Sequence, residues 1–130
     1  MSKHVSEQEL RAVTSLSGIQ RYHYFIKTVT DWGEAWGLYD DGWALSASTK
    51  GERLFPLWPA AEYARLCASK QWAGFAPTAI ALEDLLGTLL LKLDADQMSL
   101  SVSFRPNESG VVVPPATLAR DLREEMRKYL

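Results

Sequence analysis

The chain has 130 residues, of which 47% are hydrophobic and 23% charged, and its net charge is −2. This length predicts a single domain over residues 1–130, and the near-neutral charge excludes a general nucleic-acid binder, which needs a basic surface. The single cysteine excludes an intramolecular disulfide. With no membrane-length apolar run and no signal-peptide pattern, we expect a cytoplasmic protein without a membrane partner.

Two helices are the first elements predicted, after a flexible N-terminal segment over residues 1–5. Ser6 and Glu9 have the spacing of a capping box, and Leu10 and Val13 follow at helical spacing. Ser17-Gly18 breaks this helix, and a second helix runs to residues 31–33. Its apolar stripe contains Tyr22, Phe25, Ile26 and Val29.

Three strands are predicted next. Residues 36–39 and 43–46 flank Asp40-Asp41-Gly42, and Asp-Gly between apolar runs is a strong hairpin signal. A third strand passes through residues 53–55 and ends at Pro56, which cannot donate a hydrogen bond to a ladder. The pattern predicts a three-stranded antiparallel meander.

The second half of the chain alternates between helices and short strands. A helix is predicted from Pro59 to Cys67, then an irregular connection over residues 73–78 and a leucine-rich helix over residues 82–93. Residues 98–104 and 111–113 predict a C-terminal hairpin, and an amphipathic helix ends the chain. The order ααβββααββα indicates an α+β fold with an antiparallel sheet of about five strands.

The sequence satisfies no catalytic or metal-binding template. His4, His23 and Cys67 are the nitrogen and sulfur candidates, and none has a recognised ligand spacing. Cys67 lies on an apolar helix face, where burial makes a thiol inert, and His23 has no partner motif. We therefore expect neither metal nor cofactor, and the pattern favours a protein that is not an enzyme.

The aromatic residues are the remaining signal, because all five tryptophans lie between Trp32 and Trp72. A buried indole needs a partner for its N–H, whereas exposed aromatics are typical of recognition surfaces. The cluster is therefore interpreted either as core with incidental exposure or as a binding face. The candidate binding residues are Trp36, Tyr39, Trp43, Arg53, Trp58, Glu62 and Tyr63.

Several aromatic motifs also occur in a characteristic order. They are Arg21-Tyr22-His23-Tyr24-Phe25, Asp31-Trp32, Trp36-Gly37-Leu38, Gly42-Trp43-Ala44-Leu45, Phe55-Pro56-Leu57-Trp58-Pro59, Glu62-Tyr63-Ala64 and Cys67. In this order they resemble the bacterial domain-of-unknown-function family 2750, from about Ser17 to the C-terminus. The resemblance implies a small bacterial cytoplasmic α+β protein, and it brings no catalytic residue, cofactor or substrate.

Two functional hypotheses follow. The first is a non-enzymatic recognition or regulatory domain that binds a protein or peptide partner through the aromatic strand region; a toxin-neutralising immunity protein is one concrete type, by fold-level analogy. The second is a small-molecule binder or enzyme. Its pocket would lie between Trp36, Trp43, Trp58 and Tyr63, with Arg53 or Glu62 as polar anchors. The oligomeric state is left open.

Overall fold

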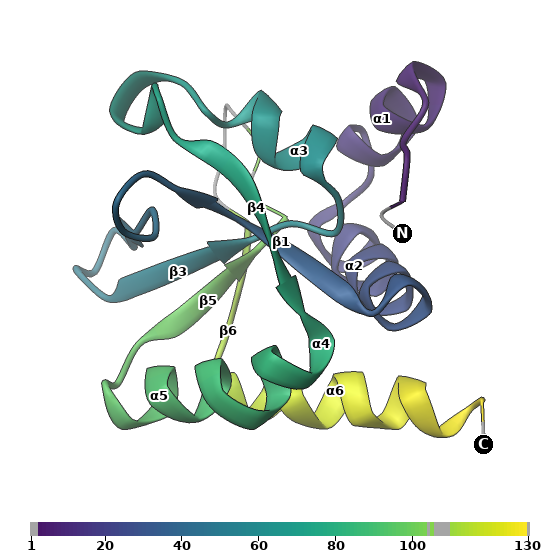
Figure 1. The fold of residues 1–130 in the computed structure, drawn as a ribbon, viewed down its shortest axis with the longest axis vertical. Coiled ribbons are helices and arrows are strands. Elements are labelled where there is room, and N and C mark those ends of the chain that lie inside the picture. Colours follow the sequence, from purple (N-terminus) through teal and green to yellow (C-terminus); the bar gives the residue numbers. More distant parts are fainter. Residues whose placement is uncertain (1–2, 104, 106–109, 130) are drawn as a thin grey trace.

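The computed structural model describes residues 3–103, 105 and 110–129 (Figure 1). The helices are α1 (Glu7–Thr14), α2 (Gly18–Trp32), α3 (Ala61–Leu66), α4 (Leu82–Asp84), α5 (Leu90–Ala95) and α6 (Pro115–Arg127), with a 3-10 turn η1 (Lys70–Trp72) and a π turn η2 (Leu85–Leu89). The strands are β1 (Glu34–Tyr39), β2 (Ser46–Ala47), β3 (Arg53–Leu57), β4 (Ala76–Ala81), β5 (Ser99–Val102) and β6 (Val111–Val113). The α+β class is confirmed. The predicted loop at residues 105–110 lies largely outside the described residues, as does Phe104.

The cap predicted at the start of the first helix forms, and Ser17, interpreted from the sequence only as a helix breaker, caps the second. The Ser6 hydroxyl accepts a hydrogen bond from the Glu9 amide at 3.1 Å, and Ser17 and Gln20 form a full capping box at the start of α2. Gly33 ends α2 in the left-handed conformation (φ 72°), where glycine has no steric penalty. The helix predicted from Pro59 begins two residues later, at Ala61.

The predicted meander is wrong, because β1 pairs with a strand that the sequence analysis treats as an irregular connection. β1 lies antiparallel to β4, which has the unpromising sequence Ala76-Pro77-Thr78-Ala79-Ile80-Ala81. The Leu82 amide donates a hydrogen bond to the Gly33 carbonyl, and from this pair hydrogen-bonded and non-hydrogen-bonded pairs alternate along β1 and β4. Pro77 falls in a non-hydrogen-bonded pair, so its missing N–H costs no bond between the strands. The register of β4 against β1 therefore allows a proline inside this strand.

The remaining four strands form a mixed sheet in the order β2-β3-β5-β6. β3 pairs with β2 antiparallel and with β5 parallel, which corrects the predicted all-antiparallel sheet; β5 and β6 form the expected antiparallel pair. A bridge between Trp36 and Trp58, with both backbone hydrogen bonds at 2.8 Å, joins the two sheets. The turn after β1 forms a hairpin closed by a single bridge, Tyr39 to Trp43.

Pro56 lies inside β3, although the sequence analysis ends the strand there. Alternate residues of a strand direct their backbone groups to the same side, and Leu54 and Trp58 use that side to pair with Ser46 and Trp36. Pro56 therefore faces the gap between β2 and β1, where its missing N–H costs no ladder bond. The tertiary arrangement explains a proline that local rules place at a strand end.

Helices cover the strands on two sides, with α4, α5 and α6 along the lower side of Figure 1 and α3 with α1 along the upper side. One core cluster lies on the side of α2, α5 and α6 and includes Phe25, Phe55, Leu100 and Leu118. A second cluster, around Trp58, Tyr63 and Trp72, lies on the side of α1 and α3. In the described part of the chain, no helix is long and apolar enough to cross a membrane.

Candidate functional site

Trp58, the tryptophan between the two prolines, is a core residue with no exposed surface. Its ring meets Trp72 edge-on, with ring centroids 6.0 Å apart. The neighbouring Cys67 is also buried, and this burial raises the pKa of its thiol to about 11, although a hydrogen bond with Trp58 opposes the rise. Cys67 is thus buried, as its position on an apolar helix face predicts.

Three residues around the turn after β1 form what we call the aromatic face: Tyr39, Trp43 and Leu45. Tyr39 is 42% exposed and Leu45 46% exposed, while Trp43 is half-buried beside them. The Tyr39 and Trp43 rings pack edge-on with centroids 5.1 Å apart, and Trp43 rests on the buried Phe55 at 5.6 Å. Leu45 lies two residues after Trp43, with the buried Ala44 between them.

Gly37 fixes the position of the Trp43 ring. A Cβ atom at Gly37 would lie 2.9 Å from Trp43 Cζ3 and 3.0 Å from Cε3, which is closer than carbon atoms approach in folded proteins. Trp43 therefore lies directly on the β1 backbone, held between Phe55 below and Tyr39 beside it. The exposed Tyr39 is consequently supported by a rigid base.

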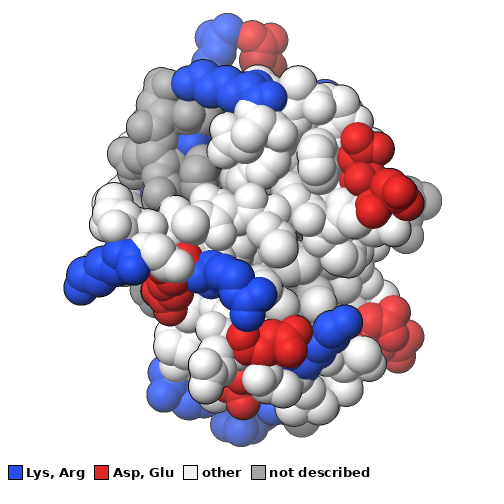
Figure 2. All heavy atoms as spheres, turned by 90° about the vertical axis from the view of Figure 1, so that its left-hand side faces the viewer, with Lys and Arg blue, Asp and Glu red and all other residues white. Residues whose placement is uncertain are grey.

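The side of the molecule that carries the turn after β1 has an area with few charges (Figure 2). The turn after β1 lies on the left-hand side of Figure 1, and this side faces the viewer in Figure 2. Figure 2 shows a broad area without Lys, Arg, Asp or Glu, bounded by acidic side chains at one edge and by mixed charges below. Asp40 and Asp41, at the tip of the turn, are exposed.

The other candidate residues do not converge on one cavity. Trp43 packs against the first core cluster, whereas Trp36, Trp58 and Tyr63 pack in or against the second. The Trp36 indole donates to Glu34 at 3.2 Å. Arg53 is exposed and donates to the carbonyl of Asp96 at 2.8 Å, so it holds the end of α5.

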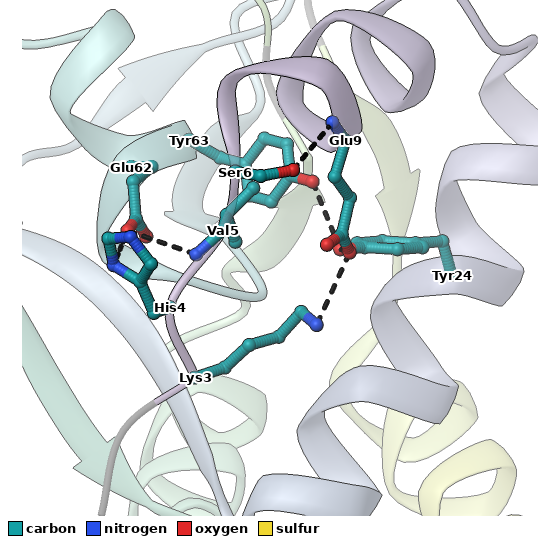
Figure 3. A network of polar contacts seen from close by, with 8 residues as sticks. All are labelled: Lys3, His4, Val5, Ser6, Glu9, Tyr24, Glu62 and Tyr63. Carbon is teal, nitrogen blue, oxygen red and sulfur yellow. Dashed lines mark hydrogen bonds and ion pairs between the residues drawn. The ribbon is translucent and has the colours of Figure 1, made fainter.

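Glu62 and Tyr63 belong instead to a polar network between α1, α2, α3 and the N-terminal segment (Figure 3). The Tyr24 hydroxyl donates to Glu9 Oε2 at 2.5 Å and lies 3.0 Å from the Tyr63 hydroxyl. Lys3 forms an ion pair with the same Glu9 oxygen at 3.3 Å. The capping-box spacing predicts that the Glu9 side chain bonds to the backbone at the start of α1. In the structure this side chain accepts a hydrogen bond from Tyr24 instead.

The N-terminal segment is attached to this network through Glu62. Glu62 Oε2 accepts a hydrogen bond from the Val5 amide at 3.2 Å and lies 3.4 Å from His4 Nδ1 (Figure 3). The Val5 side chain is buried in the second core cluster, within the segment that the sequence predicts to be flexible.

Burial keeps the phenols of the network protonated. Desolvation raises the pKa of Tyr63 to about 12, although its hydrogen bond with Tyr24 opposes the rise. Desolvation and the hydrogen bond to Glu9 raise the pKa of Tyr24 further. Neither phenol is a base at neutral pH, so the arrangement joins three helices rather than moving protons. Sequence reasoning missed Tyr24 and Glu9 because their contact joins different helices.

A small cavity lies where Trp58 and Tyr63 meet the loop after β5. It has a volume of about 10 Å³, which is room for about one water molecule. Arg21 and Arg105 also line it, and their guanidinium groups donate to the carbonyls of Leu16 and Thr14 at the end of α1. Among the described residues, no group of three or more His, Cys, Asp or Glu side chains has the arrangement of a metal site.

Comparison with known families gives one match. A family model described as "Protein of unknown function (DUF2750)" matches residues 22–122 of the chain. The match begins in α2, ends in α6 and includes the whole aromatic face. None of the curated proteins matches the sequence.

Proposed function

The chain belongs to the DUF2750 family, whose description assigns no activity, and we propose that it is a non-enzymatic recognition domain that binds a protein or peptide partner through the aromatic face. The observation that carries the proposal is the exposure of Tyr39 and Leu45 on a rigid base formed by Trp43. Tyrosine and tryptophan dominate the residues that contribute most to binding at protein interfaces.

Preorganisation is the physical reason that this surface suits binding. A side chain that is already held in place loses little rotamer freedom when a partner covers it, so more of its contact energy contributes to affinity. Trp43 is held by Phe55 and by the β1 backbone at Gly37, and it in turn supports Tyr39.

The charges around the aromatic face indicate the chemistry of the partner. Asp40 and Asp41, directly after Tyr39 at the tip of the turn, add two exposed acidic side chains beside the aromatic face. The complementary partner presents an apolar or aromatic group beside one or two basic side chains. The proposed setting is the bacterial cytoplasm, in which the single Cys67 stays reduced, and a toxin-neutralising immunity protein would be one instance of such a domain.

The experiment is site-specific photocrosslinking in the cells that produce the protein. A photoreactive phenylalanine analogue is placed at Tyr39, and the matched control carries it at Ile19, an apolar residue of α2 that is 72% exposed. We expect a discrete crosslinked protein from position 39 that is missing from position 19, and we expect Leu45→Ser in the Tyr39 variant to reduce it. Equal crosslinking from both positions, or none from position 39, would refute the proposal.

A further inference from the structure

The outer surface of the α5 and α6 layer contains a groove that no part of the described chain fills. It has a volume of about 210 Å³, and Leu86, Leu90, Leu91 and Ala119 form its apolar floor and walls. The helical segment from α4 to α5 and helix α6 run in opposite directions along the lower side of Figure 1. We call this surface the helix groove.

Leu91 is the most exposed large apolar residue of the helix groove. Its side chain is 66% exposed, although it belongs to the most leucine-rich helix of the chain, where the other leucines are buried or half-buried. The π turn η2 contributes to this arrangement, because it lets Leu85 and Leu90, five residues apart, both face the core. Leu91 then points away from the core and into the groove.

Gly87, about one helical turn before Leu91, has no side chain, so another helix can approach the backbone closely at this point. Gly87 is exposed in the middle of the helix, and a Cβ atom built on it would have no neighbour within 4 Å. Packing within the chain therefore does not require a glycine there, and glycine is unfavourable in a helix. A second helix that packs against this surface would benefit from the missing side chain.

The helix groove carries opposite charges at its two ends. Asp94 lies at the end of α5, beside the first residues of α6, and Arg123 lies further along α6, beside Leu86. The eight residues from Leu86 to Asp94 correspond to roughly 12 Å of helix. Among the described residues, neither Asp94 nor Arg123 forms an ion pair or a side-chain hydrogen bond, whereas Arg120 and Lys128 on the same helix pair with Asp121 and Glu125.

We propose that the helix groove binds a second copy of this chain, with the two copies related by a two-fold axis. A two-fold axis that lies between the two copies, in the plane of the contact and perpendicular to the line from Asp94 to Arg123, brings Asp94 of each copy against Arg123 of the other. The same rotation places Leu91 of each copy over the small residues of the partner's groove. The groove is therefore complementary in charge to a second copy of itself. A groove with charges of one sign would repel its own copy.

The size of the helix groove sets the expected strength of the dimer. Stable interfaces bury on the order of 1,200 Å² or more, and a contact of a few residues on two short helices is smaller. We therefore expect a reversible dimer with a dissociation constant on the order of 10 to 100 μM.

The test is sedimentation equilibrium of the full chain with paired charge reversals. Wild type is compared with Leu91→Ser, Asp94→Arg and Arg123→Asp, and circular dichroism checks the fold of each variant. We expect each single charge reversal to weaken the dimer at least about tenfold, because symmetry places two like-charge pairs in the interface. An equimolar mixture of Asp94→Arg with Arg123→Asp is expected to dimerise as wild type does, because both pairs are then opposite in sign.

The mixture is the decisive sample, because recovery in it requires contact between two chains. Tyr39→Ser serves as a control outside the helix groove and should leave dimerisation unchanged. Three results would each overturn the proposal: a wild-type protein that stays monomeric up to about 1 mM, a dimer that tolerates the single reversals, or single variants whose mixture does not recover. None of these bears on the partner proposed for the aromatic face, because the two surfaces are tested separately.

Discussion

Gly37→Ala is expected to destabilise the protein, because the new methyl group collides with a ring that has no room to move. The added Cβ would lie 2.9 Å from Trp43 Cζ3, so the indole must shift by several tenths of an ångström away from β1. Phe55 and Tyr39 block that shift, with ring centroids 5.6 Å and 5.1 Å from Trp43. Such overpacking costs about 1–3 kcal/mol. Replacing glycine in a strand returns about 0.5–1 kcal/mol through the unfolded chain, so the net loss is roughly 0.5–2 kcal/mol.

Urea denaturation followed by circular dichroism measures this change, with Gly87→Ala as the matched control. Gly87 has open space around it on an exposed helix, so the same substitution there should raise the free energy of unfolding by about 0.5–1 kcal/mol. Both variants are measured at low micromolar concentration, where self-association does not contribute. The two substitutions should therefore shift the urea midpoint in opposite directions. A Gly37→Ala protein as stable as wild type would refute the conclusion that Trp43 is rigidly held.

Three further predictions concern the second core cluster and its polar network. Tyr24→Phe removes the hydroxyl between Glu9 and Tyr63, and we expect a loss of about 1–2 kcal/mol in urea denaturation; an unchanged midpoint would show that the network does not stabilise the fold. Because the pKa of Tyr63 is raised from 10.0 to about 12, the folded state holds this proton more tightly. The protonated Tyr63 contributes fully to the free energy of unfolding below pH 10, and this contribution is lost as the pH rises toward 12. The free energy of unfolding should therefore fall less steeply with pH in Tyr63→Phe than in wild type between pH 10 and 12, and equal slopes would contradict this. The Cys67 thiol should resist a thiol reagent at pH 8 in the folded protein and react fully in urea, and rapid labelling without urea would show that it is accessible.

Local sequence signals predicted the features that depend on neighbouring residues. The Ser6 cap, the glycine end of α2 and the leucine-rich helix are set within a few residues of chain, and all of them form. The turn at Asp40-Asp41-Gly42 forms for the same reason, with positive φ at Asp41 and Gly42. The family was also predictable, because its motifs are a linear pattern of residues.

The pairing of β1 with β4 and of β3 with β5 was decided by contacts distant in sequence, and for these two pairs the prediction failed. β4 has low strand propensity, and it becomes a strand because β1 offers a partner in a register that accommodates Pro77. The parallel pairing of β3 with β5 likewise joins segments more than 40 residues apart, and no local pattern encodes it. A short stretch contains enough information to form a turn or a cap, but not to choose among several possible strand partners.

The sequence by itself determined that the aromatic residues gather in one part of the chain, and only the tertiary structure decided what each of them does. Trp58 enters the core because both faces of β3 are covered, Tyr63 joins Tyr24 and Glu9 between three helices, and Tyr39 stays exposed beside Trp43. Which side of a strand is covered depends on the elements that pack against it, and these come from distant parts of the chain. The direction of a single indole is therefore a property of the assembled fold rather than of its local sequence.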